Sequence, residues 1–149
     1  MNKKEKKKNP LKLKACVVAL SLWGLSAPFA LSSSPVMAAE TTSNAAQEQV
    51  AGTLLFNGIH LDKLHREEEA LAAYNDVITR FGNSQNTKIQ EDVAKALFNK
   101  GGDLYELHRI GQARADWEEL VYRFKDNPDV DIQKTVANAR HNLLVTRNF

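Results

Sequence analysis

Apolar residues recur at helical spacing through the middle of the chain, in residues 87–124. In the first part of this stretch, spacings of three and four gather five residues on one helix face: Val93, Leu97, Gly101, Leu104 and Leu107. This pattern predicts a helix over residues 87–107. After His108-Arg109 a second set begins and predicts another helix of about fifteen residues: Ile110, Ala113, Trp117, Leu120, Val121 and Phe124. The small Ala113 permits close approach of the two helices, and Trp117 fills the space beside it.

The same pattern occurs once more, earlier in the chain. A shift of 43 positions lays residues 50–81 on residues 93–124 and pairs Gly58 with Gly101 and Tyr74 with Trp117. A truncated third copy follows, since Gln47, Gln90 and Gln133 are equally spaced. Self-similarity at a fixed period of a few tens of residues is typical of stacked helical repeats. The sequence therefore predicts an all-α solenoid of antiparallel helix pairs, with repeats at about 43–85 and 86–128 and a capping helix at 129–146.

Residues that cap helices mark the start of each copy. Ser43, Asn86 and Asp129 stand 43 positions apart, and all three types accept a hydrogen bond from a free backbone N–H at a helix N-terminus. In the third copy, Arg140 replaces Leu97 and His141 replaces Phe98, as expected where one face of the last helix meets water. Glu67-Glu68-Glu69 opens a predicted helix, where carboxylates complement the helix dipole.

The N-terminal residues have a different composition from the rest. Residues 1–14 are rich in lysine, and no residue from Ala15 to Ala39 is charged. Val36-Met37-Ala38 supplies the small residues that signal peptidases accept. The segment 1–39 is therefore predicted to be a secretory signal peptide with cleavage near Ala38 or Ala39, which implies a periplasmic or secreted protein made of residues 40–149. An uncleaved membrane anchor is the alternative, although four residues interrupt the apolar run: Ser21, Gly24, Ser26 and Pro28.

Charge and cysteine content narrow the function classes. Residues 40–149 hold 13 basic and 17 acidic residues, and this net negative charge argues against nucleic acid as a partner. The only cysteine, Cys16, lies in the leader, so the processed protein is expected to lack disulfides and thiolate metal sites.

These features together resemble the tetratricopeptide repeat (TPR) family. The family pairs antiparallel helices with a small residue at its eighth position, alanine at its twentieth and an aromatic four residues later. Gly58, Ala70 and Tyr74 match this pattern in one copy; Gly101, Ala113 and Trp117 match it in the next. Two features depart from the family: the period exceeds its usual 34 residues, and histidine (His65, His108) stands at the turn between helices where glycine is common. Histidine adopts a left-handed backbone more readily than most residues do.

The resemblance implies that a peptide or short helix of another protein binds in a concave groove lined by the first helix of each pair. Carried over to this chain, the groove positions are Leu55, Phe56, Ile59, Asp62, Lys63, Lys95, Phe98, Asn99, Gly102, Tyr105, Glu106, Asn138, His141 and Asn142. Leu55, Phe56 and Ile59 form a more apolar set than a solvated wall needs, and such a patch usually marks a contact.

Self-association is the alternative to a peptide-binding groove, whereas the sequence argues against a metal site and against an enzyme. The apolar first helix could instead join two copies of the chain, because a stack with fewer than three repeats is marginal alone. A metal site is not expected, since His60 and His65 are five apart and point to different helix faces. No Gly-rich phosphate loop and no nucleophile–base motif is present, so we expect a non-enzymatic protein without a cofactor.

Overall fold

The computed structural model describes residues 35–148, and within them the side chains of residues 43–148. This part of the chain is all-α. It consists of α1 (Pro35–Lys63), α2 (Glu67–Phe81), α3 (Thr87–Glu106), α4 (Ile110–Phe124), α5 (Val130–Val145) and a short 3-10 helix, η1 (Thr146–Asn148). The predicted signal peptide lies almost entirely outside the described residues. No helix within residues 35–148 combines the length and the apolar character needed to cross a membrane.

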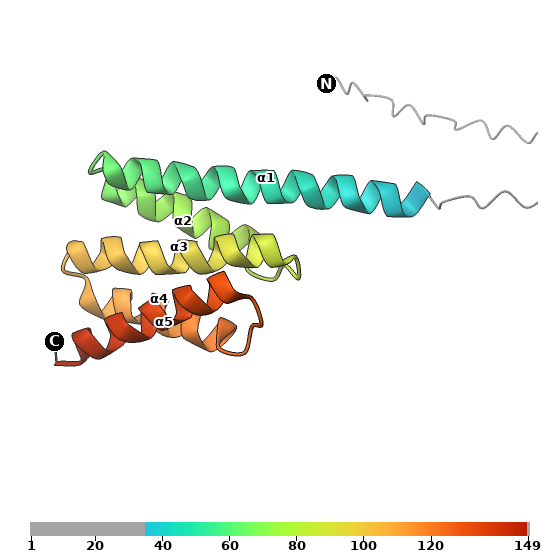
Figure 1. Ribbon diagram of the computed structural model, residues 1–149. Coiled ribbons are helices and arrows are strands. Elements are labelled where there is room, and N and C mark those ends of the chain that lie inside the picture. The colour runs from blue at the N-terminus through green and yellow to red at the C-terminus, as the bar shows by residue number, and fades with distance from the viewer. Residues whose placement is uncertain (1–34, 149) are drawn as a thin grey trace, which may run out of the picture. The chain divides into compact units, whose positions relative to one another are not determined.

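Consecutive helices pack against one another (Figure 1). Each of α2 and α4 therefore packs on two helices, α2 on α1 and α3, and α4 on α3 and α5. The odd-numbered helices also contact one another, α1 with α3 and α3 with α5. A single apolar core runs through all five helices; its largest fully buried side chains are those of Tyr74, Ile89, Leu97, Leu120 and Ile132.

The predicted N-terminal caps of α3 and α5 are confirmed. The Asn86 side chain accepts hydrogen bonds from the backbone N–H groups of Lys88 and Ile89 at 2.9 and 3.2 Å. Asp129 does the same for Asp131 and Ile132, both at 3.0 Å. These bonds satisfy N–H groups that have no partner within the helix, and so fix where α3 and α5 begin.

The turns inside the two helix pairs are also as expected. His65 and His108 have left-handed backbones, with φ of 54° and 59°. Two glutamines close the turns between the pairs: Gln90 Nε2 donates to the Ser84 carbonyl at 3.0 Å, and Gln133 Nε2 donates to the Asn127 carbonyl at 2.8 Å.

The predicted start of the first helix is wrong. Ser43 does not cap a helix, because α1 already begins at Pro35 and runs for 29 residues. Proline favours the first turn of a helix, and no residue between it and Lys63 breaks the helical run. The proposed cleavage at Ala38 or Ala39 would therefore remove the first turn of α1.

One glycine in each helix pair allows its two helices to pack closely. A Cβ atom on Gly58 would collide with the ring of Tyr74 in α2, and a Cβ atom on Gly101 would collide with the indole of Trp117 in α4. Both aromatic rings are buried, as predicted from their register. The Trp117 indole N–H donates to the Phe98 carbonyl at 3.1 Å, whereas the Tyr74 hydroxyl has no hydrogen-bond partner among the described residues.

Candidate functional site

Several of the predicted groove positions fall on the side of α1, α3 and α5 that faces away from α2 and α4. Phe56 comes two residues before Gly58, and Asn99 comes two residues before Gly101. Two residues correspond to about 200° around a helix. Since each glycine contacts the neighbouring helix, Phe56 and Asn99 point away from it. We call this side of α1, α3 and α5 the A face.

Seven of the predicted residues lie on the A face and reach solvent at least in part: Phe56, Lys63, Lys95, Asn99, Glu106, Asn138 and Asn142. Phe56 stands out because it is a large apolar side chain with 70% of its surface exposed. Its ring stacks on that of His60, with centroids 6.4 Å apart and planes 8° from parallel.

The apolar patch expected on α1 is smaller than predicted. Leu55 is buried in the core and cannot line a groove, which corrects that assignment. Ile59 is half-buried and packs against the same core, as does Phe98 of α3. The reason is geometric: Leu55 lies about 100° from Phe56 around the helix, on the side that faces the interior. Phe56 is left as the exposed member of the set.

One part of the A face is hollowed. A pocket of about 190 Å³ lies between α3 and the C-terminal end of α5 and is lined by Gly102, Tyr105, Glu106, Trp117, Asn142, Val145 and Thr146. Tyr105 is partly exposed, and its ring lies 6.2 Å from that of Trp117, tilted by 40°. The structure thus brings Tyr105 and Glu106 of α3 together with Asn142 of α5, all three of them predicted groove residues. His141 is exposed on α5 but does not line this pocket.

Some charged side chains of the A face have ion-pair partners and others do not. The Lys95 ammonium pairs with Glu91 at 2.5 Å, and Lys88 pairs with the same carboxylate at 2.7 Å. These two hydrogen bonds lower the pKa of Glu91. Lys63 and Glu106 have no ion-pair partner among the described side chains, those of residues 43–148, so their charges are available to a ligand.

Asp62, another predicted groove residue, is half-buried near a buried acidic group between α1, α2 and α3. Asp103 is only 5% exposed, and one of its carboxylate oxygens has no hydrogen-bond partner in the described part of the chain. Burial, with smaller contributions from the nearby charges of Asp62, Glu106 and Glu67, raises the pKa of Asp103 to about 7. Burial and the charges of Asp103 and Asp62 likewise raise the pKa of the Tyr74 phenol. Asp103 can therefore hold a proton at neutral pH.

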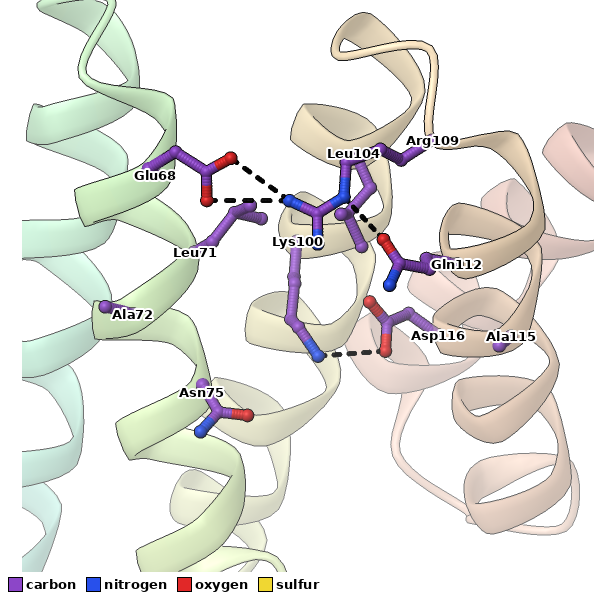
Figure 2. Close-up of a pocket in the computed structure, with 10 residues that line it drawn as sticks. All are labelled: Glu68, Leu71, Ala72, Asn75, Lys100, Leu104, Arg109, Gln112, Ala115 and Asp116. Atoms are coloured by element: carbon purple, nitrogen blue, oxygen red, sulfur yellow. Dashed lines mark hydrogen bonds and ion pairs between the residues drawn. The ribbon is translucent and has the colours of Figure 1, made fainter.

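A second hollow lies on the opposite side, between α2 and α4 and against α3, with a volume of about 490 Å³ (Figure 2). Arg109 reaches across it to Glu68 at 3.1 Å and also donates to Gln112. Deeper in, the Lys100 ammonium lies 3.1 Å from the Asp116 carboxylate. Burial raises the pKa of Asp116, and the charge and hydrogen bond of Lys100 oppose this shift.

The charged side chains of this second hollow pair with one another, so the hollow exerts little net electrostatic attraction on a charged ligand. Sequence reasoning did not find it. Glu68 and Arg109 are 41 positions apart, and their pairing depends on how α2 and α4 lie against each other.

Among the residues that the structure describes, no group of three or more His, Asp or Glu side chains is arranged to hold a metal ion. Comparisons with protein-family models, with curated proteins and with solved structures find no match to this chain.

Proposed function

We propose that the chain is a TPR-like stack of 43-residue helix pairs that binds another protein through the A face. Three observations support the repeat: α2 and α4 begin 43 residues apart and end 43 residues apart, His65 and His108 share a left-handed turn, and an aromatic ring sits on a glycine in both pairs. The same helix-pair unit occurring twice is what a stacked repeat requires.

Phe56 carries the binding proposal. In the 43-residue register, Phe56 corresponds to Asn99 and Asn142, so the A face presents one exposed aromatic ring followed by two amides across three neighbouring helices. An aromatic anchor beside amide groups suits an extended peptide, because the ring provides apolar contact and each amide can donate to and accept from a peptide backbone. The small pocket at Tyr105 would accommodate one further side chain of the peptide.

Site-specific crosslinking tests this proposal. A photoreactive phenylalanine analogue placed at Phe56, and separately at Asn99, should crosslink to another protein in the native host. Tyr122 of α4 is the matched control, because it is aromatic, 80% exposed and outside the A face. Equal crosslinking from Tyr122, or none from Phe56 and Asn99, would contradict the proposal.

Self-association through α1 is the second candidate. Val50 and Phe56 of α1, and Leu64 directly after it, are large apolar side chains that are exposed, which favours a contact between two copies. Light scattering of the full chain over a wide concentration range separates the two candidates: a mass that rises with concentration, and that Phe56→Glu returns to the monomer value, would indicate self-association.

We also infer that the protein is exported, and this rests on the sequence of residues 1–39 alone. Fractionation of cells that produce the full chain should recover it outside the cytoplasm in a shortened form. A cytoplasmic protein of full length would overturn the inference.

A further inference from the structure

The last helix leaves uncovered a face that the preceding helix of the same register buries. In α3, Leu97, Gly101 and Leu104 are buried, and Gly101 contacts Trp117 of α4. The residues 43 positions later are Arg140, Leu144 and Arg147, and all three are exposed. Together with Arg114 of α4 and Leu143, they line an open hollow of about 480 Å³. We call this surface the α5 end face.

A purely solvated end cap does not account for this surface. Leu144 is 69% exposed, and Val130 is also largely exposed on the same helix. Val130, Ala137 and Leu144 are spaced by seven and so form a stripe along one side of α5. A stripe of this kind, rimmed by charges, is what an amphipathic helix requires of the groove in which it lies.

The charge of the α5 end face is positive. Arg140 and Arg147 have no ion-pair partner among the side chains of residues 43–148. Arg114 is held in place, because its guanidinium donates to the Leu143 carbonyl at 3.1 Å and to Thr146 Oγ1 at 3.2 Å. It also pairs with Glu118 at 3.3 Å, the one ion pair that the three arginines make among the side chains of residues 43–148. The only acidic residue within α5, Asp131, lies in its first turn.

We propose that the α5 end face binds an acidic amphipathic helix of another protein, which takes the place that α2 and α4 take on α1 and α3. This surface is separate from the A face, so the inference goes beyond the proposed function. A helix in that place would begin beside Arg147, because α2 and α4 each start next to the C-terminal end of the helix they cover. Carboxylates in its first turn would then meet Arg147 and also complement the dipole of that helix.

The same geometry sets two limits on the occupant. Leu144 stands where α1 and α3 have glycine, so the incoming helix needs a small residue where α2 has Tyr74 and α4 has Trp117. A second copy of the chain paired through the same face is disfavoured, because it would bring the arginines of the two copies together without compensating acids.

Residues 67–81 of this chain provide a defined probe, since α2 is a covering helix with three glutamates in its first turn. The peptide carries Tyr74→Ala, which supplies the small residue that Leu144 requires, and a control peptide also carries Glu67→Gln, Glu68→Gln and Glu69→Gln. Binding to the full chain is followed by fluorescence anisotropy, with circular dichroism to detect helix formation. We expect the acidic peptide to bind about tenfold more tightly than the control, and the difference to shrink as salt is added.

Variants of the protein locate the site. Arg140→Glu combined with Arg147→Glu should abolish the preference for the acidic peptide, and a peptide with lysine at the three glutamate positions should bind this variant better than it binds the wild type. A peptide that keeps Tyr74 should bind more weakly than the Tyr74→Ala peptide, and Leu144→Gly should remove that difference. Phe56→Glu should leave peptide binding unchanged, which separates a failure here from a failure of the proposed A face. The lysines of residues 3–14 are present in every variant and cannot cause these differences.

Several outcomes would overturn the proposal. Equal binding of the acidic and control peptides, no binding of either, or no effect of the double arginine variant would each show that the α5 end face is a solvated cap. Binding to vesicles that contain phosphatidylglycerol, lost in the double variant and without peptide binding, would assign the face to a membrane surface. A dimer of the wild type that Leu144→Glu dissociates, again without peptide binding, would assign it to self-association.

Discussion

Helices α3 and α5 occupy the same register in the proposed repeat, yet their surroundings are opposite. α3 is covered on several sides, by α1, α2, α4 and α5, whereas within residues 35–148 α5 packs mainly on α3 and α4, with a smaller contact to the adjoining η1. The positions of Leu97, Gly101 and Leu104 in α3 correspond to Arg140 and Leu144 in α5 and to Arg147 in η1. Apolar residues are thus replaced by charged ones where no helix of the described residues covers α5. The residues of α5 that face the preceding helix pair, such as Ile132, Val136 and Ala139, stay apolar and buried.

A polar position shows the same contrast. Asp103 in α3 and Thr146 after α5 share the register, and both are buried. Thr146 Oγ1 donates to the Asn142 carbonyl at 2.7 Å and accepts from Arg114. Asp103 has one carboxylate oxygen without a hydrogen-bond partner among the described residues, and it lies near other acids. At this position the buried polar group after α5 has its hydrogen-bond partners, whereas the buried carboxylate of α3 lacks one within this part of the chain.

The largest expected effect comes from placing the arginine of α5 into α3. Leu97→Arg should lower the free energy of unfolding by about 4 kcal/mol, or prevent folding, because it buries a charge without a partner. Arg140→Leu should change it by less than about 0.5 kcal/mol, since the site is exposed. Urea unfolding measures both. A large loss for Arg140→Leu as well would mean that the two faces do not differ as described.

A smaller effect is expected from exchanging the residues at the glycine position. Gly101→Leu should cost about 3 kcal/mol by overpacking against Trp117, whereas Leu144→Gly should cost about 1 kcal/mol or less, the usual helix penalty of glycine. Thermal unfolding checks the pair, and Gly101→Ala serves as a milder variant if Gly101→Leu does not fold. If Gly101→Ala melted with the wild type, the close approach of α3 and α4 at this glycine would be refuted.

The smallest effect concerns the pH dependence of stability. The pKa of Asp103 is about 7 in the folded protein and about 3.9 in an unfolded chain. The folded state therefore holds the proton more tightly, and stability should fall as pH rises from about 4 to beyond 7. Asp103→Asn should remove about 2 kcal/mol of this fall. This is smaller than the full pKa shift would produce, because the ionised carboxylate relaxes toward water.

Thr146→Val is the matched control for this prediction. It removes a hydroxyl that does not titrate, so it should lower stability by about 1 kcal/mol at every pH. Denaturant unfolding at several pH values measures both variants. A wild-type slope that persists in Asp103→Asn would show that Asp103 is not the group that titrates.

Much of the fold followed from spacing and capping residues. The apolar pattern of residues 87–124 gave the bounds of α3 and α4 to within a residue, and Asn86 and Asp129 located two helix starts, because these signals act locally within the chain. The first helix was the exception. Ser43 suits a cap, but nothing in the preceding residues interrupts a helix, so the helix continues back to Pro35.

The candidate sites could be predicted only in part. Sequence spacing placed Phe56, Asn99 and Asn142 on a common face, and the replacement of Leu97 by Arg140 marked a face that meets water. Spacing alone could not separate Leu55 from Phe56, because neighbouring residues differ by about 100° around the helix, and burial depends on where α3 packs against α1.

Long-range pairs show what the tertiary structure alone decided. The contact of Arg109 with Glu68, the burial of Lys100 with Asp116, and the position of Asp103 near Asp62 all join different helices. The sequence by itself determined the helices and the residues that each pair uses to close, since those depend on local hydrogen bonds and helical periodicity. The packing of the pairs decided which charges are buried, paired or left on the surface, because burial and Coulomb interactions depend on distances between segments that lie far apart in the chain.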